Sequence, residues 1–361
     1  MSLDAGDVKV LLEGIMDENT SKKLGETNSI KNLECEGENA KVKITLGYPA
    51  KNYVNKLAEQ INYELKNIGA NNVEVEIDWN IVTHSVQKSL KPMENIKNVI
   101  AVASGKGGVG KSTTAINLAL ALSEEGANVG LLDADIYGPS QPKMLGLNGQ
   151  PKSEDGKTLE PMEAHGIQAM SIGFLIDDET PMIWRGPMVT QALEQLLSDT
   201  SWKDIDYLVI DLPPGTGDVQ LTLAQKIPVS GALIVTTPQD IALLDARKGL
   251  KMFEKVEVPV LGVVENMSIH ICSKCGFEES IFGNGGGESL SKENNVDLLG
   301  KLPLDISIRE LTDSGRPSVV SDPESRIAEI YCEIARKTAG RLSAQSKDYS
   351  SKFPKIVIEN N

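Results

Sequence analysis

GKGGVGKS, at positions 105–112, is the stretch of sequence that decides the fold. Its residues are Gly105, Lys106, Gly107, Gly108, Val109, Gly110, Lys111 and Ser112. They fit the phosphate-binding pattern G-x-x-x-x-G-K-[ST]. Glycines allow backbone N–H groups to turn towards a phosphate without a Cβ in the way, and the N-terminus of a following helix adds partial positive charge. The stretch therefore predicts a P-loop that binds ATP and cleaves its γ-phosphate.

The residues on either side of this loop agree with that prediction. Val99–Ala103 is a short apolar run of the kind that forms a strand buried on both faces, and Thr114–Glu125 predicts a helix. We therefore expect Lys111 to contact the β- and γ-phosphates, Ser112 to place its hydroxyl on Mg²⁺, and Thr113 to lie near the α-phosphate. The alternative is a glycine-rich turn that binds nothing, and the flanking strand and helix make that a poor explanation.

Two further predicted strands end in acidic residues. The strand at Asn128–Leu132 is followed by Asp133 and Asp135, and the strand at Tyr207–Ile210 is followed by Asp211. Residues at the carboxyl ends of parallel strands face the ligand crevice. An apolar strand that ends in aspartate fits the Walker B role, in which Asp211 holds Mg²⁺ directly or through water. Taken alone, each aspartate is equally well explained as a helix cap or a turn residue.

The apolar runs along the rest of the chain predict an α/β protein built from two units. Alternating buried strands and helices over residues 98–343 indicate a P-loop NTPase with a mostly parallel sheet and helices on both faces. Residues 1–80 predict a small N-terminal α/β domain in the order α-β-β-α-β. Polar residues 81–97 predict a linker, and polar residues 344–361 a loose C-terminal tail.

The composition excludes several classes of partner. Lys and Arg total 36 against 51 Asp and Glu, a formal net charge of -15. Such a surface repels phosphate backbones and anionic lipids, so we expect no nucleic acid and no membrane among the partners. No apolar run reaches the roughly 18 residues of a transmembrane helix, and the N-terminus has no signal-peptide pattern. Four cysteines are too few for a disulfide scaffold, and we expect a cytoplasmic protein.

One lysine and several short segments give the chain a family resemblance. Lys106, directly after the first glycine of the loop, marks the deviant P-loop shared by MinD, ParA and the nitrogenase iron protein. The segments are DADIYGPSQ at 133–141, WRGPM at 184–188, DLPPGTGD at 211–218, ENMS at 265–268 and GKLPLD at 300–305. Together they resemble the Mrp/ApbC family, ATPases implicated in carrying iron–sulfur clusters. Residues 1–80 resemble the small N-terminal domain of bacterial Mrp proteins, and the residues give Trp184 no chemical role beyond burial.

The resemblance implies a role for each polar residue of the nucleotide site. Lys106 is expected to reach across a homodimer interface and stabilise charge on the partner's nucleotide, as an arginine finger does. Asp135 matches the switch I aspartate that positions the attacking water, Asp211 matches the Walker B aspartate, and Asn266 matches the asparagine that reads adenine. The expected catalytic residues are thus Lys106, Lys111 and Asp135. A solvated loop lysine and a strand-end turn residue are the ordinary alternatives for Lys106 and Asn266.

Cys272 and Cys275 form a CxxC pair just after the predicted strand at Val260–Val264. Their spacing lets two thiolates face one metal centre, but iron–sulfur and structural zinc sites usually take four ligands. A twofold symmetric dimer would supply the other two. The resemblance implies that the pair holds a bridging [4Fe–4S] cluster in this way. Structural zinc in the same geometry, a redox dithiol and an inert pair remain as alternatives.

Two functions from different classes follow from these features. The first is an ATP-hydrolysing iron–sulfur cluster carrier, a homodimer whose partners are cluster scaffold proteins and apo iron–sulfur proteins and whose cofactors are ATP, Mg²⁺ and a [4Fe–4S] cluster. The second is a nucleotide-dependent positioning ATPase like MinD or ParA, with structural zinc at the CxxC. MinD needs a C-terminal amphipathic helix, which Pro354 disfavours. ParA needs a basic surface, which the net charge disfavours.

Overall fold

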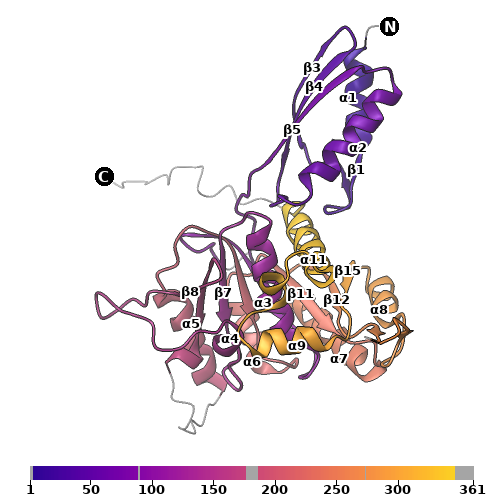
Figure 1. Ribbon diagram of the computed structural model, residues 1–361. Coiled ribbons are helices and arrows are strands. Elements are labelled where there is room, and N and C mark those ends of the chain that lie inside the picture. Colours follow the sequence, from indigo (N-terminus) through magenta and orange to yellow (C-terminus); the bar gives the residue numbers. More distant parts are fainter. Residues whose placement is uncertain (1–2, 88–89, 176–185, 273, 346–361) are drawn as a thin grey trace, which may run out of the picture.

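The computed structural model describes residues 3–87, 90–175, 186–272 and 274–345 (Figure 1). Two expectations concern residues outside these ranges, namely the burial of Trp184 and the character of the tail around Pro354. Within the described ranges, no helix combines the length and the apolar character needed to cross a membrane. Figure 1 shows a small sheet with two helices standing on top of a larger body of sheet and helices.

The larger body is built around an 8-stranded sheet with the strand order β15-β12-β11-β6-β10-β7-β9-β8. Neighbouring strands are parallel, except that β8 and β9 pair antiparallel at one edge. The prediction of a mostly parallel sheet is confirmed. The strands are β6 (Ile96–Ala103), β7 (Val129–Asp133), β8 (Met162–Ala164), β9 (Ile167–Ser171), β10 (Ile205–Asp211), β11 (Gly231–Thr236), β12 (Val260–Glu265) and β15 (Leu298–Lys301).

The register of the central strands brings three loops together. Asp211, the last residue of β10, lies opposite Val102 of β6 on one side and Asp133 of β7 on the other. The loops that follow these three strands therefore meet at the same edge of the sheet, where ligands of parallel α/β sheets bind. The start of β6 differs slightly from the sequence-based expectation: it begins at Ile96, inside the predicted linker, because Ile96 pairs with Ile205 of β10.

Helices cover both faces of this sheet, as predicted (Figure 1). Alternate residues of β6 enter different cores: Ile100 and Val102 pack with α3 and α11, whereas Ala101 and Ala103 pack with α5, α6 and α7. Because both faces are covered, the central strands are almost entirely apolar. The helices are α3 (Lys111–Glu124), α4 (Gln141–Met144), α5 (Gly186–Asp199), α6 (Asp218–Lys226), α7 (Asp240–Lys255), α8 (Gly286–Asn294), α9 (Ile306–Asp313), α10 (Ser318–Ser321) and α11 (Arg326–Ser343), with a 3₁₀ turn at Ile172–Phe174.

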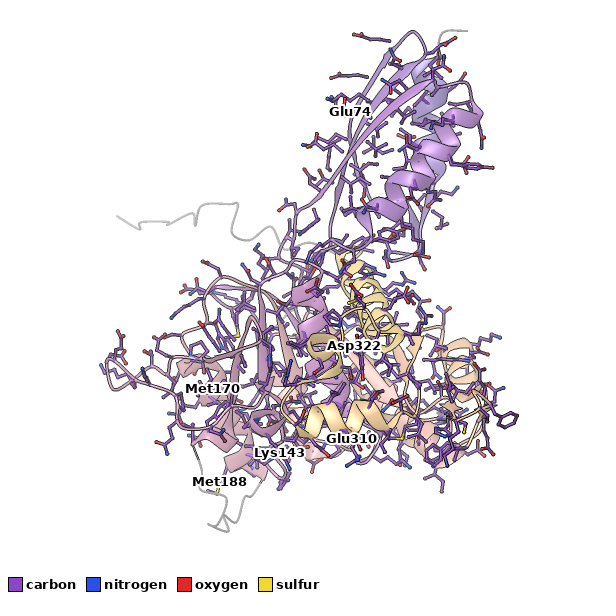
Figure 2. All side chains as sticks on the ribbon, viewed as in Figure 1. Glu74, Lys143, Met170, Met188, Glu310 and Asp322 are labelled. Atoms are coloured by element: carbon purple, nitrogen blue, oxygen red, sulfur yellow. The ribbon has the colours of Figure 1, made fainter. Side chains whose placement is uncertain are left out.

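The N-terminal residues form a separate 3-stranded sheet in the order β3-β4-β5. Its elements are α1 (Ala5–Gly14), β3 (Ile30–Glu36), β4 (Asn39–Leu46), α2 (Val54–Asn67) and β5 (Asn72–Trp79), with a short unpredicted hairpin of β1 (Met16–Asp17) and β2 (Lys22–Lys23). Val42 and Ile44 of β4 are fully buried with the apolar faces of α1 and α2. The opposite face is polar, with Lys41 paired to Glu74 at 2.8 Å; Figure 2 labels Glu74 on this open face.

Contacts between this small sheet unit and the larger body lie at the C-terminal ends of α3 and α11. Glu125, directly after α3, is fully buried and forms an ion pair with Arg336 of α11. Its carboxylate also accepts a hydrogen bond from the Asn52 backbone at 3.0 Å. Arg341 of α11 donates to the Asn19 carbonyl of the small unit. Helix α3 therefore begins at the P-loop and ends at the contact with the small N-terminal unit.

Candidate functional site

The P-loop connects β6 to α3 and has a backbone that its glycines make possible. Gly108 and Gly110 have φ angles of 80° and 82°, in the left-handed region that favours glycine. A Cβ added at Gly110 would lie 2.1 Å from Nδ2 of Asn266, and one added at Gly105 would lie 2.2 Å from the Asp245 carbonyl carbon of α7. A Cβ at Gly108 would meet nothing within 4 Å. The loop is thus fixed at its ends and open at its centre, as a phosphate cradle must be.

Lys111, Ser112 and Asp211 come together beneath this loop. The Lys111 side chain is only 5% exposed, and its ammonium forms an ion pair with the Asp211 carboxylate. The same ammonium donates to Ser112 Oγ at 3.3 Å and lies 3.8 Å from Asp135 Oδ2. The Lys111 ammonium therefore occupies the space between the Ser112 hydroxyl and the carboxylates of Asp135 and Asp211. Thr113, the next residue of α3, is half-buried.

Asp133 organises the loop that carries Asp135. Its fully buried carboxylate accepts hydrogen bonds from the backbone N–H groups of Asp135 at 3.2 Å and Ser140 at 3.1 Å, and from Ser171 Oγ at 3.0 Å. Burial and the neighbouring charge of Asp211 raise the pKa of Asp133 to about 7. Burial also raises the pKa of Asp135, while the charge of Lys111 acts in the opposite direction. Asp133 thus holds the loop, and Asp135 is left half-buried beside the lysine.

Gln141 is a member of this site that the sequence-based reasoning did not single out. It is the first residue of α4 and is 1% exposed. Its side-chain Nε2 donates to Asp211 Oδ2 at 2.9 Å and to the Ser112 carbonyl at 3.1 Å. The only sequence feature that pointed to it was its place at the end of the DADIYGPSQ segment.

Lys106 and Asn266 differ in how completely they are held. Within the described part of the chain, the half-buried Lys106 side chain has no hydrogen bond or ion pair, and only its carbonyl is bound, by Ser104 Oγ at 2.9 Å. Asn266 is 8% exposed, and its Nδ2 donates to the Val109 carbonyl at 2.9 Å. The Asn266 amide therefore braces the P-loop backbone, whereas the Lys106 ammonium is available to another molecule.

The cysteine pair lies on a small antiparallel hairpin of β13 (His270–Ile271) and β14 (Glu278–Glu279). The turn is tight: Gly276 N–H donates to the Cys272 carbonyl at 2.8 Å. The Cys272 sulfur accepts hydrogen bonds, the strongest from the backbone N–H of Lys274 and the others from the N–H and the thiol of Cys275. These hydrogen bonds lower the pKa of the Cys272 thiol. Hydrogen bonds to sulfur favour the thiolate, which is the metal-binding form.

This hairpin offers two metal ligands and an apolar surround. Cys272 is half-buried and Cys275 is exposed. Ile271, Phe277 and Ile281 are 44%, 65% and 50% exposed. Across the described residues, no group of three or more His, Cys, Asp or Glu side chains is placed to hold a metal ion. The described residues therefore supply two of the four ligands that an iron–sulfur or structural zinc centre takes.

The other two cysteines behave as core residues. Burial raises the pKa of the Cys332 thiol on α11, and burial also raises the pKa of Cys35 on β3. Neither thiol is biased towards the metal-binding thiolate, in contrast with Cys272.

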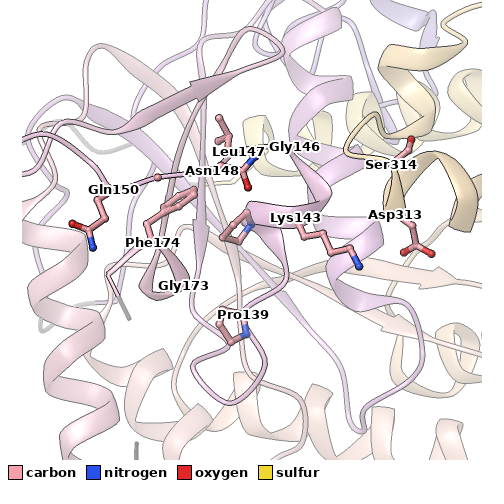
Figure 3. Close-up of a pocket in the computed structure, with 12 residues that line it drawn as sticks. Pro139, Lys143, Gly146, Leu147, Asn148, Gln150, Gly173, Phe174, Asp313 and Ser314 are labelled. Atoms are coloured by element: carbon pink, nitrogen blue, oxygen red, sulfur yellow. The ribbon is translucent and has the colours of Figure 1, made fainter. Parts of the chain in front are cut away.

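A cavity of about 750 Å³ lies between the segment around α4, the turn at Gly173 and Phe174, and the end of α9 (Figure 3). Pro139, Lys143, Phe174 and Asp313 are among the residues that line it. No residue of the P-loop lines it. The nucleotide site is therefore identified by the phosphate-binding residues 105–113, and this cavity is a separate feature.

Two family models match this chain. The family described as NUBPL iron-transfer P-loop NTPase matches residues 95–339, and the family described as iron-sulfur cluster assembly protein matches residues 6–77. An iron-sulfur cluster carrier protein of Pseudomonas fragi is 60% identical over 275 residues, which cover 76% of this chain and 96% of that protein.

Solved structures agree with the fold. A nucleotide-binding protein of Archaeoglobus fulgidus, in complex with ADP and with Co, is 37% identical and superposes with a TM-score of 0.57, covering 66% of this chain and 93% of that one. The cell division ATPase MinD of Pyrococcus furiosus is 24% identical with a TM-score of 0.51, covering 66% of this chain and 97% of that one. The second similarity concerns the fold alone.

Proposed function

This chain belongs to the NUBPL iron-transfer P-loop NTPase family, and on that premise we propose that two copies of it hold a [4Fe–4S] cluster and couple its transfer to ATP hydrolysis. It is an iron–sulfur cluster carrier of the P-loop NTPase class. The cluster is its cargo, and ATP is the substrate of its chemistry. The observation that carries the proposal is a cysteine pair that is two ligands short of a cluster site, with hydrogen bonds that favour the thiolate of Cys272. The pair follows closely after Asn266, whose side chain contacts the P-loop.

The residues beneath the P-loop fit a magnesium ion. The Lys111 ammonium, itself a cation, lies against the Asp211 carboxylate and the Ser112 hydroxyl. When ATP brings its phosphates to the loop, the lysine has a stronger partner in them, and Ser112 and Asp211 are then free to hold Mg²⁺. The ion supplies positive charge that offsets the negative charge of the β- and γ-phosphates.

The other polar residues divide the work of hydrolysis. Backbone N–H groups of residues 105–113 and the N-terminus of α3 hold the phosphates. Asp135 orients the attacking water, and Lys111 stabilises the phosphate charge that builds up as the bond breaks. Lys106, whose ammonium is unengaged within the described residues, serves the nucleotide of the partner subunit. Asn266 contributes to adenine recognition at the end of β12.

The connection between nucleotide and cluster runs through a short segment after β12. Asn266 donates to the Val109 carbonyl at 2.9 Å, so this segment is in contact with the P-loop. Ser268 Oγ then bonds the Leu302 carbonyl at 3.0 Å, and His270 Nδ1 lies 3.1 Å from the Leu304 carbonyl, just before Cys272. A change in the P-loop on ATP binding or hydrolysis can therefore move the hairpin that carries the cysteines.

The partners follow from the cargo. Cluster scaffold proteins supply the cluster and apo iron–sulfur proteins receive it, in the cytoplasm, where a labile cluster and reduced thiols are compatible. Residues 98–343, extended to the start of β6 at Ile96, act as the ATPase unit, and residues 1–80 form a separate unit that docks partners or regulates the ATPase.

The decisive test measures iron, sulfide and zinc per chain after anaerobic reconstitution, on the wild type and on a Cys272→Ala/Cys275→Ala double variant. We expect about two Fe and two sulfides per wild-type chain, which is one [4Fe–4S] per dimer, and loss of both in the variant. The Cys35→Ala/Cys332→Ala double variant is the matched control and should retain the cluster. Zinc near half an atom per chain without stable iron would instead identify a structural clasp and refute the carrier mechanism.

A further inference from the structure

Gln141 joins three parts of the nucleotide site. Its backbone N–H donates to Asp133 Oδ2 at 3.1 Å. Its side-chain Nε2 donates to Asp211 Oδ2 at 2.9 Å and to the Ser112 carbonyl at 3.1 Å. One residue of α4 therefore touches the ends of β7 and β10 and the first turn of α3 at once.

The orientation of the Gln141 amide is fixed by its neighbours. A carboxylate and a backbone carbonyl are both acceptors, so only the –NH₂ group of the side chain can face Asp211 and Ser112. The carbonyl oxygen Oε1 must then point to the other side. It is buried, and it has no hydrogen-bond donor among the described residues. A buried acceptor without a donor is unfavourable and rare in folded proteins, so a donor from outside the protein is the natural explanation.

We propose that Gln141 is a positioning residue for the magnesium ion, with Oε1 accepting a hydrogen bond from a water of the ion's hydration shell while Nε2 holds the Asp211 carboxylate. This inference rests on the proposed ATP and Mg²⁺ site. Mg²⁺ gives up its waters reluctantly and usually keeps several of them when bound in proteins. Those waters are strong donors because the ion polarises them. The ionised phosphate oxygens of ATP, which are the part of the nucleotide expected at this loop, carry no proton to donate and cannot satisfy Oε1.

The two functions of the Gln141 side chain can be separated by substitution. Gln141→Met has a similar length and removes both the donor and the acceptor. Gln141→Glu keeps an oxygen at the position of Oε1 but replaces the –NH₂ group by a second oxygen, which loses the bonds to Asp211 and Ser112. If the acceptor oxygen is what matters, the glutamate variant keeps the Mg²⁺ affinity that the methionine variant loses. If only the hydrogen bonds of the amide –NH₂ group matter, both variants lose it.

The measurement is the affinity for a fluorescent ADP analogue as a function of free Mg²⁺, with EDTA as the magnesium-free reference. We expect Gln141→Met to lower the apparent Mg²⁺ affinity about tenfold, which corresponds to the free energy of one charge-assisted hydrogen bond. The affinity for the ADP analogue measured in EDTA should change little. Gln141→Glu should bind Mg²⁺ at least as tightly as the wild type, because its added negative charge attracts the ion. Equal Mg²⁺ affinity in wild type and Gln141→Met would overturn the proposal, as would equal weakening in both variants.

A distant glutamine provides the control for general loss of stability. Gln87 is also buried, and its amide donates to the carbonyls of Ala224 at 2.6 Å and Ile227 at 3.2 Å. These contacts lie at the end of α6, just before β11 begins, whereas the P-loop follows the end of β6. Gln87→Met should leave the Mg²⁺ dependence unchanged. If Gln141→Met does not fold, Gln141→Asn, which withdraws the oxygen by one methylene, takes its place with the same expectation. A wild type that binds nucleotide without any Mg²⁺ dependence would contradict the proposed function itself, and not merely this residue's part in it.

Discussion

The P-loop site and the cysteine hairpin are opposite kinds of functional region in one chain. Beneath the P-loop nearly every polar group has a partner: Lys111 contacts Asp211 and Ser112, and Asp133 accepts several hydrogen bonds. At the hairpin, Cys275 is exposed and the described chain supplies two ligands where a cluster takes four. The polar groups of the nucleotide site thus contact one another within one chain, whereas the proposed function requires a second copy to complete the cluster site and to receive Lys106.

The largest expected effect is on hydrolysis in a Lys111→Met variant. Removal of the ammonium takes away the positive charge that stabilises phosphoryl transfer, and we expect kcat to fall by about a thousandfold or more. Iron content after reconstitution should stay at the wild-type level, because the contacts of the Lys111 ammonium in the described part of the chain are with Asp211, Ser112 and Asp135. A circular dichroism spectrum like that of the wild type is the control for folding. A loss of iron that parallels the loss of hydrolysis would show that the two regions are not separable.

The next effect is on hydrolysis across the dimer. Lys106→Ala should lower kcat by about a hundredfold with little change in ATP affinity, because the lysine is expected to act on the partner's nucleotide only as charge builds up. Mixing this variant with Lys111→Met should restore activity to about a quarter of the wild type, since half of the dimers are mixed and each has one complete site. The measurement is steady-state phosphate release at equal total protein. Absence of any recovery on mixing would argue that Lys106 acts within its own chain.

A third prediction concerns the rigidity of the P-loop. Gly110→Ala places a Cβ against Nδ2 of Asn266, and it also puts an alanine at a backbone φ of 82°. We therefore expect the free energy of unfolding to fall by about 3 kcal/mol and ATP binding to be lost. Gly149 is the matched control: its φ is 92°, but an added Cβ meets nothing within 4 Å. Gly149→Ala should cost only about 1–2 kcal/mol and leave ATP binding intact. Chemical denaturation and nucleotide titration measure both quantities, and equal costs would show that the contact with Asn266 does not constrain the loop.

Local patterns in the sequence predicted the parts of the site that depend on short spacings. The glycines, Lys111 and Ser112 follow from one motif, and Asp211 follows from an apolar run that ends in aspartate. The parallel sheet then places Asp211 beside β6 and β7, as the alternation of strands and helices predicted. These features could be read from the sequence because each is fixed by neighbours within a few residues or by the general arrangement of α/β sheets.

The features that the sequence did not predict depend on contacts between distant segments. Gln141 matters because the four-residue helix α4 brings its side chain to Asp211, 70 positions along the chain. The Glu125–Arg336 ion pair joins residues 211 positions apart. The hairpin of β1 and β2 has strands of two residues, too short for any periodicity to show. In each case the residue types are ordinary, and only the tertiary arrangement gives them a role.

The smallest expected effect is also the one that tests the exposed region most directly. Cys275 is exposed and its thiol holds no core in place, so Cys275→Ala should change the free energy of unfolding of the cluster-free protein by no more than about 0.5 kcal/mol. The same variant should hydrolyse ATP within about twofold of the wild type when no cluster is bound, because the P-loop contacts of Asn266 do not involve the thiol. Cys332→Ala, at a buried thiol on α11, should be more destabilising because it leaves a cavity in the core. If Cys275→Ala lost ATP hydrolysis in the absence of the cluster, the cysteine hairpin would affect the nucleotide site even when no cluster is bound.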